Sequence, residues 1–449
     1  MSAPTVPGPI AGARPRALGE PPRGPPRKNG LRVAYLMSRF PKLTETFVLY
    51  EMLALEDRGV QVEVFPLIRQ PEETRHPEAG RLMRRAHYHP FLSLGALGAT
   101  WHFLRRDPAR LLRVGWEVLS GTWGSANFFV GALGILPKTI FFAREAERLG
   151  VQHVHAHFAN HPSLAAFIVG RLTGIPYSFT AHGSDLHVER RMLEPKVRTA
   201  AFVVTVSSYN KDLIVEECGE DVRHKIRIIH CGVDPEAFSP AYRPDKGAGR
   251  ALRVVCVASL EEVKGHRFLI EACRRLEDRG VSVECDLVGT GPLHRTLTAQ
   301  VEEAGLRDRI RFHGGLPRPE VARMLKQAHV AVLASHPTPS GKREGIPVAL
   351  MEAMATGLPV VASAVSGIPE LIQHEGSGIL VPPGDPEALA DALARLANDD
   401  DLRQWLGSAG RHKVMREFNL HTGAGRMVEQ ILAGGNGSPG ERAQGRTEG

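Results

Sequence analysis

Two glutamates, Glu344 and Glu352, lie eight positions apart in the segment KREGIPVALMEAMATGLPVV and are the residues best placed to do chemistry. Pro347 suits the first turn of a helix, which places Glu344 just before that helix and Glu352 on its second turn. Gly345 and Ile346 would then lie at a helix N-terminus, whose free N–H groups favour a phosphate. Glu352 would be free to accept hydrogen bonds from hydroxyl groups, such as those of a ribose. The alternative is an ordinary helix with an acidic first turn and one exposed glutamate.

A lysine and a glycine turn in the same half of the chain could also bind a phosphate. Lys264 follows a strand-like segment and precedes a helical pattern in ASLEEVKGHRFLIEA, so its ammonium group could stabilise a developing diphosphate. Gly291 ends another strand-like segment in VGTGPL, where a glycine lets a ligand approach the backbone. The alternatives are a surface lysine at the end of a loop and a tight strand-to-helix turn.

Histidines form a second group, in the first half of the chain. His182 follows a strand-like segment and would point from its end into a cleft, or it has a structural role there. Asp185 could cap the next helix. His153, His155 and His157 alternate and therefore lie on one face of a strand. We expect no metal site at these three imidazoles, because carboxylate partners at a suitable spacing are not evident.

The segment SRFPKLTET, which follows the first strand-like run, contains two cations and two threonines. Arg39 and Lys42 could bind a phosphate of a second substrate, and Thr44 or Thr46 would cap the helix that follows. A simple helix cap beside solvated cations is the alternative.

Alternating strand and helix patterns must position all these residues. Residues 31–37 and 60–65 form strand-like runs around a helical pattern at 46–56, and the alternation returns from residue 151 and again from residue 253. This pattern predicts an α/β protein of two Rossmann-like, doubly wound domains joined near residue 245. Ligands bind outside the carboxyl ends of the strands in such sheets, so we expect a ligand site between the two domains.

The expected organisation has six parts. They are a disordered tail over residues 1–30, an N-terminal domain over 31–238 with a helical insertion at about 90–148, a linker over 239–250, a C-terminal domain over 251–418, a terminal helix over 419–433 and a disordered tail over 434–449.

Composition narrows the class of protein. The chain has 449 residues, of which 43% are hydrophobic and 23% charged, which excludes a wholly disordered or collagen-like chain. Its net charge of +7 is modest, so we expect no nucleic-acid partner, whereas an anionic substrate or a membrane surface fits. Five cysteines without a C-x-x-C pair indicate reduced thiols and a cytoplasmic location.

The longest apolar run, residues 127–143, is interrupted by Pro137 and Lys138, and we expect that it does not span a membrane. Its surroundings are rich in aromatic residues and arginines, a mixture that could rest on an anionic bilayer face. The alternative is a helical insertion that packs on its own domain. The residues concerned are Trp101, Phe103, Arg105, Arg106, Arg110, Arg113, Trp116 and Trp123.

The segment from Ser335 to Val361, S-x8-E-G-I-P-x-x-L-M-E-A-M-A-x-G-L-P-V-V, resembles the donor-site motif of retaining glycosyltransferases of family 4. These are GT-B enzymes with two Rossmann-like domains facing across a cleft. The resemblance covers about Leu31 to Phe418 and is greatest to enzymes of bacterial exopolysaccharide synthesis of the colanic-acid type. Further matching motifs are SRFPKLTETFVLYEM, HVHAHF, FTAHGSD, HCGVDPEAF and VGTGPL.

The resemblance implies a role for each candidate residue. Glu344 would contact the donor sugar and Glu352 the nucleotide ribose, while His182 would lie near the sugar. The family usually has Gly-Arg-Leu before its lysine, whereas this chain has Ser259 in place of the arginine. Either Ser259 and backbone amides suffice, another arginine such as Arg343 compensates, or turnover is weak. The implied donor-binding residues are Lys264, Ser259, Gly291, Gly315, Gly345, Ile346, Pro347 and Glu352, the catalytic residues are Glu344 and His182, and Arg39, His157 and Asp185 would lie on the acceptor side.

The implied activity is transfer of a sugar, with retention of anomeric configuration, from a nucleotide diphosphate sugar to a hydroxyl of a lipid-linked or polysaccharide acceptor. Exopolysaccharide or glycolipid biosynthesis is the expected context, without a metal or other cofactor. The enzyme would be cytoplasmic, with peripheral contact to the inner membrane face. The alternatives are an epimerase or phosphorylase on the same fold, and a non-catalytic nucleotide-sugar-binding or scaffold protein.

Overall fold

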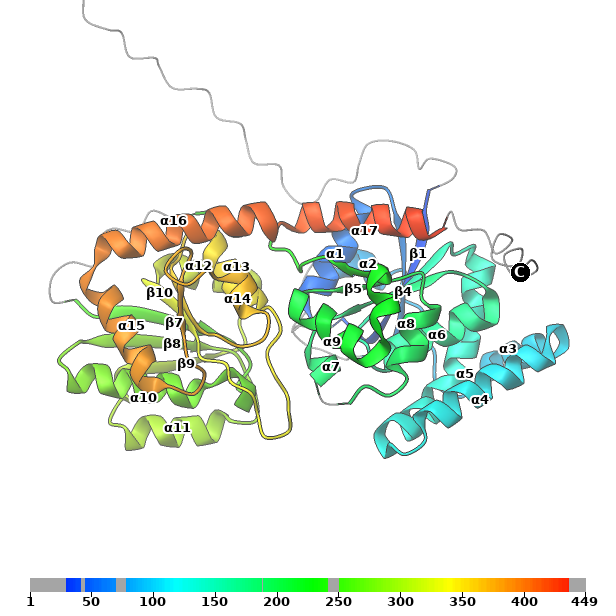
Figure 1. The fold of residues 1–449 in the computed structure, drawn as a ribbon, viewed down its shortest axis with the longest axis horizontal. Coiled ribbons are helices and arrows are strands. Elements are labelled where there is room, and N and C mark those ends of the chain that lie inside the picture. The colour runs from blue at the N-terminus through cyan, green and yellow to red at the C-terminus, as the bar shows by residue number, and fades with distance from the viewer. Residues whose placement is uncertain (1–29, 42–44, 70–77, 188, 241–249, 436–449) are drawn as a thin grey trace, which may run out of the picture.

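The computed structural model describes residues 30–41, 45–69, 78–187, 189–240 and 250–435. The tails expected at 1–30 and 434–449 and the linker expected at 239–250 fall almost entirely outside these ranges. Two six-stranded parallel sheets form the centres of two α/β domains, which confirms the expected fold class (Figure 1).

The N-terminal sheet has the strand order β2-β1-β3-β4-β5-β6. Helices cover both faces of a parallel sheet, so its strands are buried almost continuously, and every residue of β3 and β4 is buried here. The strands are β1 (Arg32–Phe40), β2 (Gln61–Arg69), β3 (His153–His157), β4 (Tyr177–Ala181), β5 (Phe202–Thr205) and β6 (Ile226–Ile228).

Helices lie between successive parallel strands of this domain along the chain, as in βαβ units. They are α1 (Thr46–Glu56), α2 (Ala79–Met83), α3 (Leu94–Arg106), α4 (Pro108–Thr122), α5 (Ala126–Leu149), α6 (His161–Thr173), α7 (Ser184–His187), α8 (Leu193–Thr199), α9 (Ser208–Cys218) and the 3₁₀ helix η1 (Glu220–Lys225). Gly150 and Gly174 end α5 and α6 in the left-handed conformation, with φ of 67° and 82°, which glycine adopts without steric cost.

The C-terminal sheet has the order β12-β11-β10-β7-β8-β9. Its strands are β7 (Leu252–Val257), β8 (Val283–Val288), β9 (Ile310–Gly314), β10 (Val330–Leu333), β11 (Val360–Ser363) and β12 (Ile379–Val381). The helices are η2 (Glu262–Lys264), α10 (His266–Asp278), α11 (His294–Glu303), α12 (Arg318–Gln327), α13 (Val348–Ala355), α14 (Ile368–Leu371), α15 (Pro386–Asn398), α16 (Asp400–Glu417) and α17 (Leu420–Gly435).

The chain returns to the N-terminal domain at its end. Figure 1 shows α16 and α17 running along one side of the molecule, from the C-terminal domain to the N-terminal domain. Leu420, Met427 and Ile431 of α17 share a core with Val33 and Tyr35 of β1. The last helix therefore belongs structurally to the first domain and links the two domains a second time.

The apolar run at 127–143 is part of one longer helix, α5, which continues through Pro137. With 24 residues and a mean hydropathy of 1.5 in its most apolar window, α5 is the one helix of the described residues long and apolar enough to cross a membrane. Its inner face is part of the N-terminal core. Phe142 packs edge-on against Phe65 of β2, and the buried ammonium of Lys138 donates to the Leu67 carbonyl at 2.6 Å.

Candidate active site

The pair of Lys264 and Glu344 forms the centre of the candidate site in the C-terminal domain. Lys264 ends η2 in the loop after β7, and Glu344 lies between β10 and α13. The Lys264 Nζ atom is 2.5 Å from Glu344 Oε2, and Ser335 Oγ donates to the same oxygen at 3.4 Å. Both charged side chains are largely buried, with 21% and 13% exposure. Their mutual attraction is therefore stronger than in bulk water.

Helix α13 positions the segment before it as expected. Pro347 directly precedes the helix, and Ile346 is buried. Leu350 and Met351 anchor the helix in the C-terminal core. Glu344 therefore precedes α13 by a few residues, as the position of Pro347 predicts, and the first N–H groups of the helix have no partner within it.

Glu352 lies on the second turn of α13, at a place where both domains contribute side chains. Burial raises the pKa of Glu352 to about 7, opposed by the positive charge of Arg318. The Arg318 guanidinium lies 3.9 Å from the ring centre of Tyr50, a residue of α1 in the N-terminal domain. Glu352 also acts electrostatically on the Tyr50 hydroxyl, whose pKa is raised mainly by burial. Glu352 is therefore a partly desolvated carboxyl group near the domain interface.

His182 is the candidate residue of the N-terminal domain closest to this region. The turn that carries it is held by Asp185, whose carboxylate accepts the main-chain N–H groups of His182 at 3.0 Å, Gly183 at 2.8 Å and Ala159 at 2.5 Å. These partners precede Asp185, which itself lies inside α7, so the expectation that it caps the next helix is wrong. Burial raises the pKa of Asp185, while the three N–H groups oppose that rise.

The two domains touch at this point. A Cβ atom at position 345 would come within 2.5 Å of the main-chain oxygen of His182. Nearby, the carboxylate of Glu370 accepts the N–H groups of Ser208 at 2.8 Å and Tyr209 at 3.1 Å, at the start of α9. The structure thus brings the segment containing Glu344 and the turn containing His182 together at the domain interface.

The glycine turn after β8 packs against the loop that carries Ser259. A Cβ atom at Gly291 would lie 2.5 Å from the Leu260 oxygen, so what approaches the backbone here is the chain's own loop. This contact supports the tight-turn interpretation. Gly315 is exposed after β9, beside Thr290.

The loop that carries Ser259 lacks the arginine that the family pattern leads one to expect. Ser259 is half-buried, and its carbonyl accepts the N–H of Glu261 at 2.8 Å. The Arg343 guanidinium, which could compensate, instead donates to the Tyr209 hydroxyl of the other domain at 3.2 Å. Lys264 is the cation paired with Glu344 in the described residues.

The expected phosphate-binding segment near residue 40 is only partly described. Arg39 is exposed at the end of β1 and lines a small pocket with Phe40 and Glu45. Lys42 and Thr44 lie outside the described residues. The residue that precedes α1 is Glu45, which makes no capping hydrogen bond through its side chain, and Thr46 is already the first helical residue. The expectation that Thr46 caps this helix is wrong.

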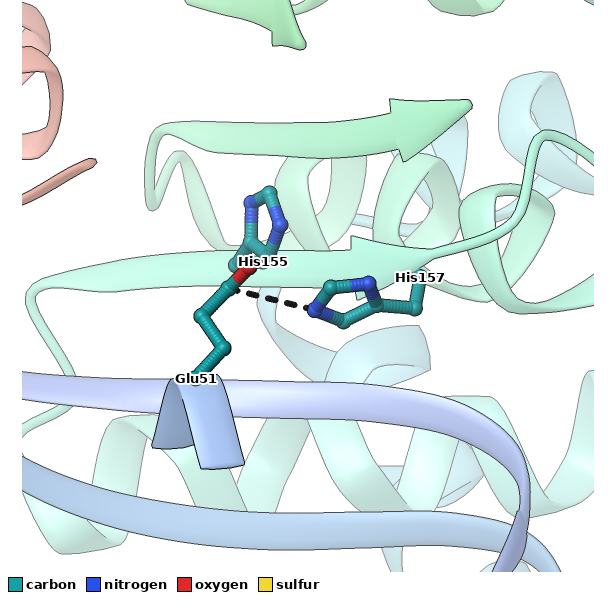
Figure 2. Close-up of side chains that lie close together, drawn as sticks. All are labelled: Glu51, His155 and His157. Atoms are coloured by element: carbon teal, nitrogen blue, oxygen red, sulfur yellow. Dashed lines mark hydrogen bonds and ion pairs between the residues drawn. The ribbon is translucent and has the colours of Figure 1, made fainter. Parts of the chain in front are cut away.

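Glu51 was missed by the sequence analysis. It extends from α1 toward His155 and His157 on β3, and its Oε1 atom lies 3.2 Å from His157 Nε2 (Figure 2). The ligand atoms of these three residues lie within 4.8 Å of one another and could hold a cation. The expectation that the histidines lack a carboxylate partner is therefore wrong. No local signal reveals it, because Glu51 and His157 are 106 positions apart.

The comparisons with known proteins agree with the fold. Residues 240–413 match the family of glycosyl transferases group 1, and residues 127–237 match glycosyltransferase family 4. The chain is 32% identical over 416 residues to the amylovoran biosynthesis glycosyltransferase AmsK of Erwinia amylovora, covering 90% of this chain and 99% of AmsK. It is also 32% identical over 410 residues to WcaL of Escherichia coli (strain K12), a provisional colanic acid biosynthesis glycosyltransferase, covering 87% of this chain and 96% of WcaL.

Among solved structures, Anabaena Alr3699/HepE in complex with UDP and glucose has a TM-score of 0.65 at 17% identity, covering 90% of this chain and 100% of HepE. The architecture is that of a GT-B glycosyltransferase, with two Rossmann-like domains. This chain belongs to the group 1 family of glycosyltransferases. The family resemblance drawn from the sequence motifs is thereby confirmed.

Proposed function

We propose that this glycosyltransferase moves a sugar from a nucleotide diphosphate sugar to a hydroxyl of a lipid-linked or polysaccharide acceptor, with retention of anomeric configuration. The observation that carries the proposal is the Lys264–Glu344 pair beside the start of α13, facing the turn of His182. The name of AmsK supports an exopolysaccharide context, and the UDP and glucose bound to HepE support a nucleotide-sugar donor.

In the proposed reaction the donor diphosphate binds at the N-terminus of α13 and competes for Lys264. Lys264 and the helix N–H groups then receive the negative charge that develops as the diphosphate leaves. Glu344, freed from its lysine, orients hydroxyls of the sugar. Glu352 accepts hydrogen bonds from the ribose. Retention follows if the acceptor attacks on the face from which the diphosphate leaves, with the leaving phosphate taking the acceptor's proton.

The proposed acceptor side lies in the N-terminal domain. His182 and His157 are hydrogen-bonded to each other, with His182 Nε2 and His157 Nδ1 2.9 Å apart, and Asp185 holds the turn of His182. Arg39 would bind a phosphate of the acceptor. Contact between the domains excludes water, which would otherwise hydrolyse the donor.

We further propose that the reaction needs no metal ion, because Lys264 and the start of α13 can together supply positive charge to the diphosphate. Activity unchanged by EDTA is the expected result, and activity that EDTA abolishes and Mg²⁺ restores would contradict it.

We also propose a cytoplasmic location with peripheral membrane contact. The support is a set of exposed apolar side chains on α3 and α4. Figure 1 shows these two helices on the side of the N-terminal domain away from the C-terminal domain. Trp116 is 73% exposed and Trp123, which follows α4, 70%. Trp116 also lines an open apolar pocket of about 320 Å³ formed by residues of α3, α4, α5 and α6. Aromatic and basic side chains together favour an anionic bilayer surface.

The test is release of nucleoside diphosphate by the purified protein from a panel of UDP-, GDP-, ADP- and TDP-sugars with lipid-linked acceptors. Glu344→Ala is expected to abolish the release. Glu375→Ala, which removes an exposed ion pair with Arg395 elsewhere in the same domain, is the matched control. NMR of the product's anomeric proton reports retention. A Glu344→Ala variant as active as the wild type would refute the site, and donor binding without turnover on any acceptor would favour a binding protein.

A further inference from the structure

The carboxylate of Glu51 is largely buried, with 19% of the side chain exposed, and it forms hydrogen bonds with two side chains of the same domain. Burial would raise the pKa of Glu51, but the imidazoles of His157 and His155 and the Tyr35 hydroxyl lower it to about 2. An ionised carboxylate can only accept hydrogen bonds. Tyr35 therefore donates its O–H to Glu51 Oε1 at 2.8 Å, and His157 donates an Nε2–H to the same oxygen at 3.2 Å.

The position of the proton on His157 determines the direction of the next hydrogen bond, between His157 and His182. When an imidazole carries a single proton and that proton is on Nε2, its Nδ1 atom is an acceptor. His157 Nδ1 lies 2.9 Å from His182 Nε2, so His182 must donate from Nε2 and carry its lone pair on Nδ1. Burial holds the pKa of His182 well below its usual range, so the imidazole of His182 is neutral.

The last atom in this series of hydrogen bonds is Nδ1 of His182. It is 3.8 Å from the Cys231 sulfur, and burial keeps that thiol protonated by raising its pKa. A thiol is a weak donor, so a substrate hydroxyl can replace it on Nδ1. His182 lies at the domain interface against Gly345, the neighbour of Glu344.

Aromatic packing holds this arrangement in place. The His182 ring lies 4.7 Å, centre to centre, from both Phe47 and Phe158, and it stacks on His157 at 5.2 Å. A flip of the His182 ring would have to disturb these contacts and break the bond to His157 Nδ1.

We infer that Glu51 is a positioning residue which, through His157, fixes the proton of His182 on Nε2, so that His182 Nδ1 acts as a hydrogen-bond acceptor for a hydroxyl of the substrate. This inference rests on the proposed function, because it takes His182 to contact the substrate. If His182 Nδ1 is an acceptor, the enzyme should prefer a substrate with a hydroxyl next to it. Methylation of that hydroxyl would leave Nδ1 without a strong hydrogen-bond donor.

A cation held by Glu51, His155 and His157 is the competing explanation of the cluster. Hydrogen bonds account for the same geometry, because His155 Nδ1 is 2.8 Å from Ser178 Oγ and its Nε2 is 3.0 Å from Thr180 Oγ1. A cation would have to displace the bond between His157 and Glu51. Metal analysis of the purified protein separates the two explanations.

The experiment is NMR of protein labelled with ¹⁵N-histidine, in which long-range proton–nitrogen couplings identify the protonated nitrogen of each ring. In the wild type, His157 and His182 are expected as Nε2–H tautomers, assigned by comparison with His157→Asn and His182→Asn. Glu51→Leu is expected to abolish this preference in His182, and Glu51→Gln to retain it, because an amide oxygen still accepts the His157 Nε2–H.

Kinetics supply the second readout. Glu51→Leu should lower kcat by about 10- to 100-fold, the usual loss when a group that orients a functional histidine is removed, with little change in KM for the donor. Glu51→Gln should restore most of kcat. The matched control is Glu63→Leu, because Glu63 also pairs with a histidine of this domain, His87 Nε2, at 3.0 Å.

A wild-type His182 with its proton on Nδ1, or with protons on both nitrogens, would overturn the inference. An unchanged His182 tautomer in Glu51→Leu, or one bound metal ion per chain, would overturn it too. The NMR measurement needs no donor. Expected tautomers without sugar transfer would therefore refute the proposed function alone, and sugar transfer with the wrong tautomer would refute this inference alone.

Discussion

Gly345 of the C-terminal domain lies so close to the main-chain carbonyl of His182 in the N-terminal domain that a Cβ atom at position 345 would come within 2.5 Å of that oxygen. The neighbouring atom belongs to the backbone, so a side-chain rotation cannot relieve the contact. The absence of a side chain at Gly345 thus allows the segment of Glu344 to approach the turn of His182.

The first prediction is that Gly345→Ala keeps the domains from closing fully. Displacement of the site residues by about 1 Å should lower the rate of sugar transfer by about 100-fold. Small-angle X-ray scattering should show a larger radius of gyration than in the wild type. Gly134→Ala in α5 is the control, because a Cβ atom there meets nothing within 4 Å. A fully active Gly345→Ala variant would show that this contact is not needed.

The second prediction concerns the cation paired with Glu344. Lys264→Met should lower kcat by about 10²- to 10³-fold, because it removes a preorganised charge that stabilises the leaving diphosphate. The rate at which nucleoside diphosphate is released measures the effect. Lys342→Met, which breaks the neighbouring 2.5 Å pair with Glu261, serves as the control and should retain activity. Equal losses in both variants would argue against a special role for Lys264.

The third prediction is a pH dependence of stability due to Glu352. Burial raises the pKa of Glu352 from 4.5 to about 7, so between these values the folded protein retains a proton that the unfolded chain releases. Stability therefore falls as the pH rises through this window, by up to roughly 3 kcal/mol. Glu352→Gln removes this loss, so it should stabilise the protein more at pH 8 than at pH 5.

Denaturant unfolding of both proteins at the two pH values measures this difference. Glu375→Gln, a change of an exposed carboxylate, should show no such pH-dependent gain. A Glu352→Gln effect that is the same at pH 5 and pH 8 would contradict the raised pKa.

The fourth prediction concerns the exposed aromatic side chains on and after α4. The double substitution Trp116→Ala and Trp123→Ala should weaken binding to phosphatidylglycerol-containing vesicles about tenfold or more, because each indole that leaves water contributes over ~1 kcal/mol. Co-sedimentation with vesicles measures the bound fraction. Trp405→Ala in α16 is the control, since Trp405 is also exposed, at 53%, but lies in the other domain. Equal binding of all three proteins would rule out this surface as the contact.

Much of the fold could be predicted from local patterns. The helix at Thr46–Glu56 has the expected bounds, because apolar periodicity and turn residues act over a few neighbouring positions. The position of Pro347 predicted that Glu344 precedes α13 and that Glu352 lies on its second turn. Packing in the N-terminal core outweighs the local cost of Pro137 inside α5.

By itself, then, the sequence determined the two α/β domains, the helix at the glutamate pair and the family. Tertiary structure alone decided that Glu51 meets His157, that Gly345 meets the carbonyl of His182, and that α17 packs on the N-terminal domain. The physical reason is sequence separation. Each of these contacts joins segments more than 100 positions apart, and no local propensity encodes such contacts, which form only when whole domains bury their apolar faces together.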